Sequence, residues 1–445
     1  TIASVFGAST YLDAFLIANR IPNLFRDMLA EGALGSAFTK VFTSIYDIEP
    51  KRALKLFSDF ITLGLLLTVI ITIIGILFAP YFVSVLTLLT SQTQKGDLFF
   101  LNTVNITKVV FPFLGLAILN SIIMGVLYQQ NKFFISALSS SLLNIGYIIG
   151  ATIVGSLFFY ILPQNIEHKF ANRAILGLAI GVLLGGILQI IMQIYFIWKN
   201  IIKKCEWTFA INFLYSKDVK HVIKLMLPAA IASSAGTINI LINTNFATML
   251  QSGAVSWLNY AFHLIQLPVG LFGVAIGSVA IPSFTKALRA SNQRVNSKVS
   301  QEFQAAIELV LWFMIPSCIF LLLNSLNVVK FLYEHGRFDS FASHKTSQAL
   351  FAYSFGIVAY GLIKVLTSFY YAVERTSYAM KVSIISILIN LIFNILLVKR
   401  YGHVGLATTS SITLTINALL LIIGLKPHKL IINKNKLFKT IMLLS

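Results

Sequence analysis

The chain has 445 residues, of which 57% are hydrophobic and only 11% are charged, and its formal net charge is +19. In soluble domains about a quarter of all residues are charged, so this composition excludes an ordinary soluble enzyme or binding domain. Unbroken apolar runs long enough to cross about 30 Å of hydrocarbon recur along the whole length, for example at 60–86 and 175–198. We therefore expect an all-α polytopic membrane protein.

Other classes of protein are excluded by what the sequence lacks. No polar domain gathers the basic residues, so the positive charge predicts cytoplasmic loops rather than binding to nucleic acid. Cys205 and Cys318 lie far apart and show neither a disulfide framework nor metal-ligand spacing. Since Gly-rich phosphate loops, HExxH motifs and nucleophile elbows are also missing, we expect neither an enzyme nor a metal site.

The predicted elements begin with a stub at 1–6, which we expect to be the end of a first helix that is truncated in this chain. The next helix covers about 11–30 and continues in a polar-ended segment to about 46. Further spans are expected at 56–86, 99–128, 133–162, 173–198, 221–248, 254–285, 303–329, 346–373, 378–398 and 403–424. Lys and Arg are richer in the loops after every second span and in the tail, which places these parts in the cytoplasm.

An internal repeat organises these spans. Residues 21–40 align without a gap with residues 267–286, and Pro22 matches Pro268 at an offset of 246 residues. The same offset pairs Asp13 with Asn259 and Asn144 with Asn390. A repeat of six spans gives both halves one orientation, related by an axis along the membrane normal, with a binding site between them.

From this repeat we expect two six-helix lobes around a central cavity. The first lobe covers 1–215, the second covers 216–425, and 426–445 form a basic cytoplasmic segment. The start of the second lobe maps onto positions before residue 1, which is why the first helix is expected to be truncated.

One expected helix carries far more charge than its membrane location favours, including Asp13, Arg20, Arg26 and Glu31. A charge at the bilayer centre costs at least about 2.5 kcal/mol and normally faces a cavity or a partner. Arg20 and Arg26 are six residues apart, so they cannot share one narrow face of a straight helix. A break between them could bring both to one cavity, and the candidate hinges are Pro22, Gly32 and, in the second half, Pro268.

Arginine binds phosphate oxygens through a planar fork, so these residues favour an anionic, phosphate-bearing substrate. Lys364 adds a cation within a later span. Three alternatives stay open: Arg26 or Lys364 snorkels to headgroups, Arg20 pairs with Asp13 about two turns earlier, and Glu31 caps a helix end or pairs with an arginine.

Each of the remaining polar residues within the expected spans has two possible roles. His263 is either a packing histidine or a site residue. Asn243, Asn390 and Asn394 are explained by hydrogen bonds between helices, and the alternative is a site for a monovalent cation.

The stretch "VFGASTYLDAFLIANRIPNLFRDMLAEGALGSAF", residues 5–38, resembles the signature of the bacterial lipid II flippase family MurJ (MviN), in the multidrug/oligosaccharidyl-lipid/polysaccharide exporter superfamily. Residues 252–286 resemble a second family segment. The resemblance implies a flippase of the bacterial cytoplasmic membrane that serves peptidoglycan synthesis. It would move undecaprenyl-pyrophosphate-linked disaccharide-pentapeptide (lipid II) to the outer leaflet by alternating access. Membrane lipid and cell-wall synthesis proteins are the implied partners.

The resemblance also assigns residues. The family's cavity arginine corresponds to Arg26, its DAF aspartate to Asp13, its AEGA glutamate to Glu31 and a late basic residue to Lys364. Some members bind sodium, and the nearest counterparts here are Asn243, Asn390, Asn394 and Ser410.

This chain departs from the family pattern at several points. "YAFHL" places His263 where an arginine is usual, and the sodium-site counterparts include no aspartate, so coupling to Na⁺ or H⁺ stays open. The family's first helix and its last two helices have no counterpart in this sequence.

Two other functions are compatible with the sequence. One is a related exporter, either of another lipid-linked oligosaccharide or of drugs in exchange for cations. A drug exporter should place acids rather than arginines in its cavity. The other is a cell-wall scaffold that transports nothing.

Overall fold

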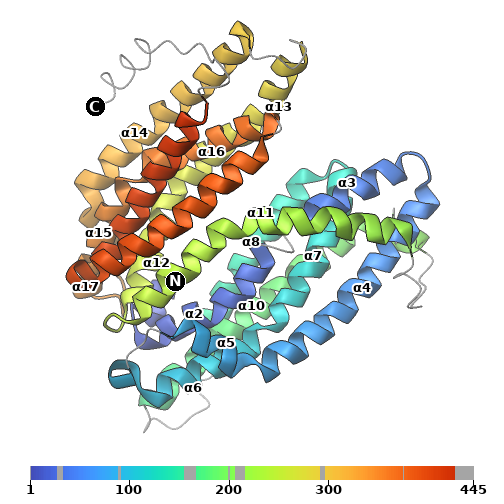
Figure 1. Cartoon of the computed structure of the whole chain (residues 1–445). Helices are drawn as coiled ribbons and strands as arrows, with labels where there is room; N and C mark the ends of the chain where they lie inside the picture. Colours follow the sequence, from blue (N-terminus) through green and yellow to red (C-terminus); the bar gives the residue numbers. More distant parts are fainter. Residues whose placement is uncertain are drawn as a thin grey trace. The chain divides into compact units, whose positions relative to one another are not determined.

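The computed structural model describes residues 2–27, 34–88, 92–154, 167–198, 201–205, 216–290, 296–373 and 375–425 (Figure 1). All regular elements within these residues are helices, as the sequence predicts. The chain divides into two compact units, unit 1 (Thr1–Asn245) and unit 2 (Phe246–Ser445). The expected lobe boundary between 215 and 216 stays a prediction.

Prolines determine where several helices of unit 1 begin. The helices are α1 (Ile2–Phe6), α2 (Thr10–Phe25), α3 (Gly35–Tyr46), α4 (Pro50–Leu77), α5 (Ala79–Leu86), α6 (Gln92–Val110), α7 (Pro112–Gln129), α8 (Phe133–Ile149), the π-helical η2 (Gly150–Val154), α10 (Glu167–Ile197), the 3₁₀ turn η3 (Ile202–Lys204) and α11 (Lys217–Thr248). Proline lies in the first turn of α4, α5 and α7, where its missing N–H costs nothing. The span expected at 56–86 is accordingly two helices, which meet at Phe78.

Unit 2 contains two further breaks. Its helices are α12 (Ala254–Pro268), the π-helical η5 (Val269–Val274), α13 (Ala275–Ala290), α14 (Ser297–Tyr333), α15 (Ser340–Ser354), α16 (Ile357–Ala372) and α17 (Thr376–Ile423). α15 and α16 are together long and apolar enough to cross a membrane, and they are bent by 47° at the break between them. α17 is two helices joined at Gly402, whose φ of +54° suits glycine. A Cβ on Gly405 would lie 2.6 Å from the Leu397 carbonyl oxygen, so the two parts fold back on each other (Figure 1).

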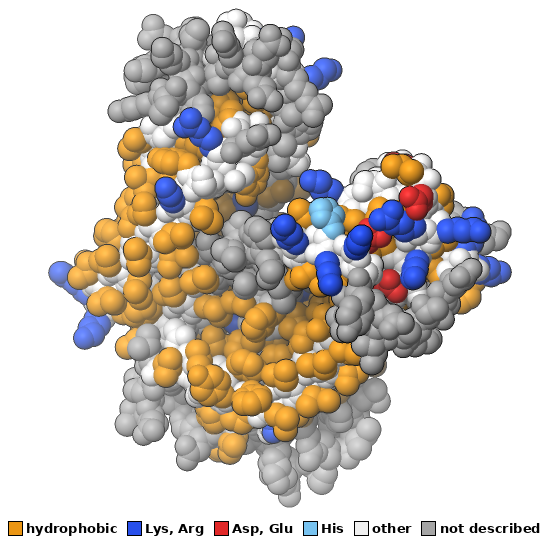
Figure 2. All heavy atoms as spheres, turned by 45° about the vertical axis from the view of Figure 1, so that its right-hand side comes forward, with side chains coloured by type: hydrophobic (Ala, Val, Ile, Leu, Met, Phe, Trp, Pro, Cys, Tyr) orange, Lys and Arg blue, Asp and Glu red, His pale blue; other side chains and the backbone are white. Residues whose placement is uncertain are grey.

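The surface exposes many large apolar side chains, as expected for a protein embedded in a lipid bilayer. Seven helices of the described part are long and apolar enough to cross a membrane, or eight when the bent pair counts as one span. Large apolar side chains such as Val69, Leu77 and Leu323 are more than half exposed, and orange side chains cover broad areas in Figure 2. Soluble monomers rarely expose apolar patches of this extent. The chain is therefore a multi-pass membrane protein.

A close backbone contact in unit 1 joins α8 and η2 to α10. A Cβ on Gly181 would lie 2.4 Å from the Gly146 carbonyl oxygen and 2.8 Å from the Gly150 Cα. Small residues at four-residue spacing let helix backbones approach in this way within membranes. The same interface holds a buried hydrogen bond, which Gln193 Nε2 donates to Ser139 Oγ at 2.7 Å.

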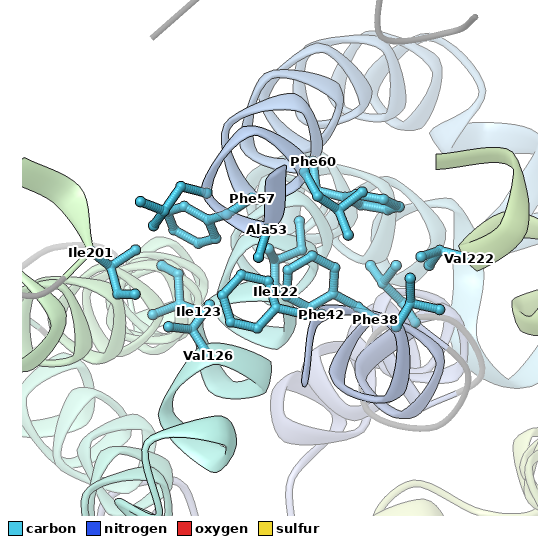
Figure 3. Close-up of a cluster of buried hydrophobic side chains, with 14 of the residues drawn as sticks. Phe38, Phe42, Ala53, Phe57, Phe60, Ile122, Ile123, Val126, Ile201 and Val222 are labelled. Atoms are coloured by element: carbon cyan, nitrogen blue, oxygen red, sulfur yellow. The ribbon is translucent and has the colours of Figure 1, made fainter. Parts of the chain in front are cut away.

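An aromatic core holds α3, α4, α7 and the start of α11 together (Figure 3). Phe38 and Phe42 stack with ring centroids 5.4 Å apart, and the Phe60 ring meets Phe38 edge-on at 5.2 Å. Cys205 lies at the edge of this core, where its thiol contacts the Leu54 carbonyl oxygen at 3.8 Å. Burial raises the pKa of the Cys205 thiol to about 11.

We expect Gly181→Ala to lower the free energy of unfolding by about 1–3 kcal/mol, because the added methyl group meets backbone atoms that cannot yield. Thermal unfolding in detergent measures this effect. Gly270→Ala is the matched control, since a Cβ there would meet nothing within 4 Å. Equal unfolding temperatures for the two variants would contradict the close packing of α8 and α10.

We expect Cys205 to react slowly with maleimide, because the thiolate is the nucleophile and its pKa is raised. The thiolate fraction should be small at neutral pH and grow about tenfold with each pH unit below the pKa. Mass spectrometry of a Cys318→Ser variant measures the labelling rate at several pH values. Fast labelling of the folded protein at neutral pH would rule out the buried thiol.

Candidate functional site

The charged helix α2 begins with a side-chain cap. Ser9 Oγ accepts a hydrogen bond from the Leu12 amide at 3.3 Å, and the Asp13 amide donates to the Ser9 carbonyl oxygen at 3.0 Å. Asp13 is fully buried in this first turn. A carboxylate at a helix N-terminus is stabilised by the helix dipole, so the placement of Asp13 partly compensates its burial.

A polar contact in the middle of α2 was not singled out in the sequence. Asn19 Nδ2 donates to the Tyr147 hydroxyl of α8 at 3.0 Å, and the Phe15 ring meets the Tyr147 ring edge-on at 6.3 Å. The one sequence signal for it is an asparagine within an apolar helix, which commonly bonds to a neighbouring helix. Arg20 follows directly and is half-buried.

Arg26 lies where α2 ends, on a π-helical turn that it shares with Asp27. Its Nη2 and Nε lie 2.9 Å and 3.2 Å from Asp27 Oδ1, and its guanidinium lies 5.9 Å from the centroid of the Phe113 ring on α7. The side chain of Arg26 is 20% exposed. This charge is therefore held against protein by one carboxylate and one aromatic face. Glu31 and Gly32 lie outside the described residues.

The two candidate hinge prolines share a local structure. Pro22 lies inside α2 and is followed by π-helical backbone at Arg26 and Asp27, while Pro268 ends α12 and leads directly into η5. At the repeat offset, Arg26 corresponds to Phe272 of η5. Single π-helical turns are frequent at functional sites, and both halves of the repeat have this irregular backbone after the proline.

The position equivalent to Arg26 lacks charge but keeps an aromatic partner. Phe272 stacks on Phe313 of α14, with ring centroids 4.3 Å apart and planes 5° from parallel. Both halves thus place a planar group of the π-helical turn on a phenylalanine ring. Only in unit 1 is that planar group a cation.

Lys364 is brought close to η5 within unit 2. Glycines make room for its stem: a Cβ on Gly277 would lie 3.2 Å from the Lys364 Cβ, and one on Gly273 would lie 3.9 Å from its Cγ. Lys364 Nζ lies 5.2 Å from the centroid of the Tyr360 ring, and the lysine is half-buried. His263 lies on α12 before Pro268 and is exposed.

Only two of the candidate cation ligands are shown in contact. Asn394 Nδ2 donates to Asn390 Oδ1 at 3.0 Å, and both side chains are buried. Ser410 Oγ donates to the Leu406 carbonyl oxygen of its own helix at 3.1 Å, and Asn243 lies on α11 in unit 1. Across the described ranges, no group of three or more His, Cys, Asp or Glu residues is placed to hold a metal ion.

Comparison with known proteins places these features in a family. The family model "Lipid II flippase MurJ" matches residues 2–444. A probable lipid II flippase MurJ of Buchnera aphidicola subsp. Schizaphis graminum is 33% identical over 424 residues, which cover 94% of this chain and 77% of that protein.

Solved structures agree with this match. A lipid II flippase MurJ in an inward closed conformation aligns with a TM-score of 0.80 and 26% identity, over 100% of this chain and 86% of that one. An inward-facing multidrug resistance MATE family transporter of the MOP superfamily shares the fold, with a TM-score of 0.72 at 14% identity over 95% and 94% of the two chains. The chain therefore belongs to the lipid II flippase MurJ family, whose members are transporters and not enzymes.

Proposed function

We propose that this chain moves the lipid-linked peptidoglycan precursor lipid II from the cytoplasmic to the outer leaflet of the bacterial cytoplasmic membrane. Transport proceeds by alternating access of two lobes around a central cavity, in which cationic side chains hold the pyrophosphate of the headgroup. Family membership supports the substrate, and the two-fold repeat supports the mechanism.

The observation that carries the headgroup assignment is the environment of Arg26. Its charge has been added to a π-helical turn whose counterpart in unit 2 holds Phe272, so the fold does not require a cation there. The guanidinium is held between Asp27 and Phe113 rather than extended along the surface. Arginine binds phosphate oxygens through charge-assisted hydrogen bonds that its planar guanidinium directs, so an arginine at this position favours an anionic headgroup.

The other candidates have supporting parts in this proposal. Lys364, on its glycine-lined seat beside η5, supplies a second cation, and the exposed His263 supplies a polar contact where relatives of the family carry arginine. Arg20, Asp13 and Glu31 balance the charge of the site. Pro22 and Pro268 are the hinges beside the π-helical segments, and Gly32 is a further hinge.

Coupling to Na⁺ or H⁺ has weaker support. Asn390 and Asn394 already bond to each other, and a pair of neutral amides attracts a monovalent cation less than a carboxylate does. We therefore expect lipid movement to continue when sodium is replaced by a cation too large to enter the bundle.

We expect Arg26→Ala to lower the rate of lipid II flipping by about tenfold or more, because one hydrogen bond to a charged group contributes roughly 1.5–3 kcal/mol. Proteoliposomes that contain fluorescent lipid II and an external quencher measure the rate. Arg26→Lys tests the planar fork and should recover only part of the activity.

Arg400→Ala is the matched control for this experiment. Arg400 also stacks on an aromatic ring, with its guanidinium 5.6 Å from the Tyr401 ring centroid, but it is exposed. This variant should flip lipid II at the unchanged rate. An unchanged rate for Arg26→Ala would remove the residue from the site, and failure of the unaltered chain to flip lipid II would favour the scaffold or another cargo.

A further inference from the structure

The repeat and the packing assign α11 to different halves of the molecule. By sequence, α11 opens the second six-helix repeat, because residues 221–248 are the first span of that half. By its contacts, however, the chain as far as Asn245 belongs to unit 1. Nearly the whole of α11 therefore packs with the helices of the first repeat. Three groups of contacts within unit 1 account for this.

The first contact is a two-pronged ion pair at the start of α11. Arg52 of α4 donates from Nε to Asp218 Oδ2 and from Nη2 to Asp218 Oδ1, each at 2.8 Å, across 166 positions of the chain. A fork of this kind fixes direction as well as distance. Glu49 lies beside it, with its Oε1 3.4 Å from Arg52 Nη1.

The second is hydrophobic. Val219 and Val222 are 1% and 0% exposed and belong to the aromatic core of unit 1 (Figure 3). Ile223, Leu225 and Met226 are partly buried against the same core. The first turns of α11 are therefore built into the interior of unit 1 and cannot leave it without exposing that core.

The third lies at the other end of the helix. Asn245 Nδ2 donates to the Val85 carbonyl oxygen at the end of α5, at 3.1 Å. Only five residues later, Leu250 is the neighbour of Gly402 in unit 2, 4.0 Å from where a Cβ on that glycine would lie. Gly253 follows with φ +90°, a conformation that L side chains rarely adopt, and α12 begins. The change from one unit to the other is confined to residues 246–253.

We propose that α11 as far as Asn245 moves as a fixed part of unit 1, although the repeat places it in the second half, and that the two units pivot at residues 246–253. The moving body on the other side is then α12 to α17. This inference rests on the proposed transport function only in that the pivot serves alternating access.

A cross-link at the start of α11 tests the proposal. Arg52→Cys and Asp218→Cys are introduced after Cys205 and Cys318 have been replaced by serine, and the pair is joined by a short bis-maleimide. If α11 stays with unit 1, the link joins two points of one body, and lipid II flipping should change by less than about twofold. Loss of more than about tenfold on linking would overturn the proposal.

Spin-label distances test it without any need for transport. Labels at Lys55 and Lys224 report α11 against α4, and labels at Lys224 and Lys381 report α11 against α17; all three positions are exposed. We expect a narrow distance distribution for the first pair, and a broader one that shifts with added lipid II for the second. A broad first pair, or two equally narrow and unchanging pairs, would overturn the proposal. Absence of flipping with the expected distances would instead contradict the proposed function alone.

Discussion

Polar groups that enter hydrocarbon are stabilised by partners inside the protein, and this constraint shapes many of the described helix contacts. Asn19 bonds to Tyr147 and Asn394 to Asn390. Several hydroxyls bond back to their own helix, as Thr68 does to the Gly64 carbonyl oxygen at 2.7 Å. This internal pairing lowers the free-energy cost of placing polar side chains in the membrane. Arg26 follows the same rule, because its charge is held by the adjacent Asp27 and lies over the Phe113 ring of α7.

Duplication explains how charge could be added without loss of the fold. Both halves keep a proline followed by π-helical backbone, and both rest a planar side chain on phenylalanine. Arginine and phenylalanine both end in a flat group, so either residue can pack on the phenylalanine ring at this position. The scaffold thus tolerates either residue, and a cation can be gained on one side while the other side keeps an apolar contact. The charge at Arg26 is therefore separable from the packing that holds this part of the fold.

The sequence predicts the helices well, because length and apolar content determine a membrane span, and both arms of α17 were expected at 378–398 and 403–424. The repeat predicts the paired prolines, but not the π-helical form of the backbone after them. Pairings across the chain were out of reach: nothing local marks Tyr147 as the partner of Asn19, or Arg52 as the partner of Asp218. The packing of α11 shows most clearly what the sequence does not predict. The repeat indicates which helices correspond to each other, whereas the burial of Val222 depends on the hydrophobic core against which α11 packs.

The turn at Gly402 joins the two arms of α17 without any intervening loop. A helical hairpin of this kind has no slack, so neither arm can slide along the other without breaking the turn. Asn390 and Asn394 lie on one arm and Ser410 on the other, so the short turn at Gly402 limits how far the distance between these residues can change.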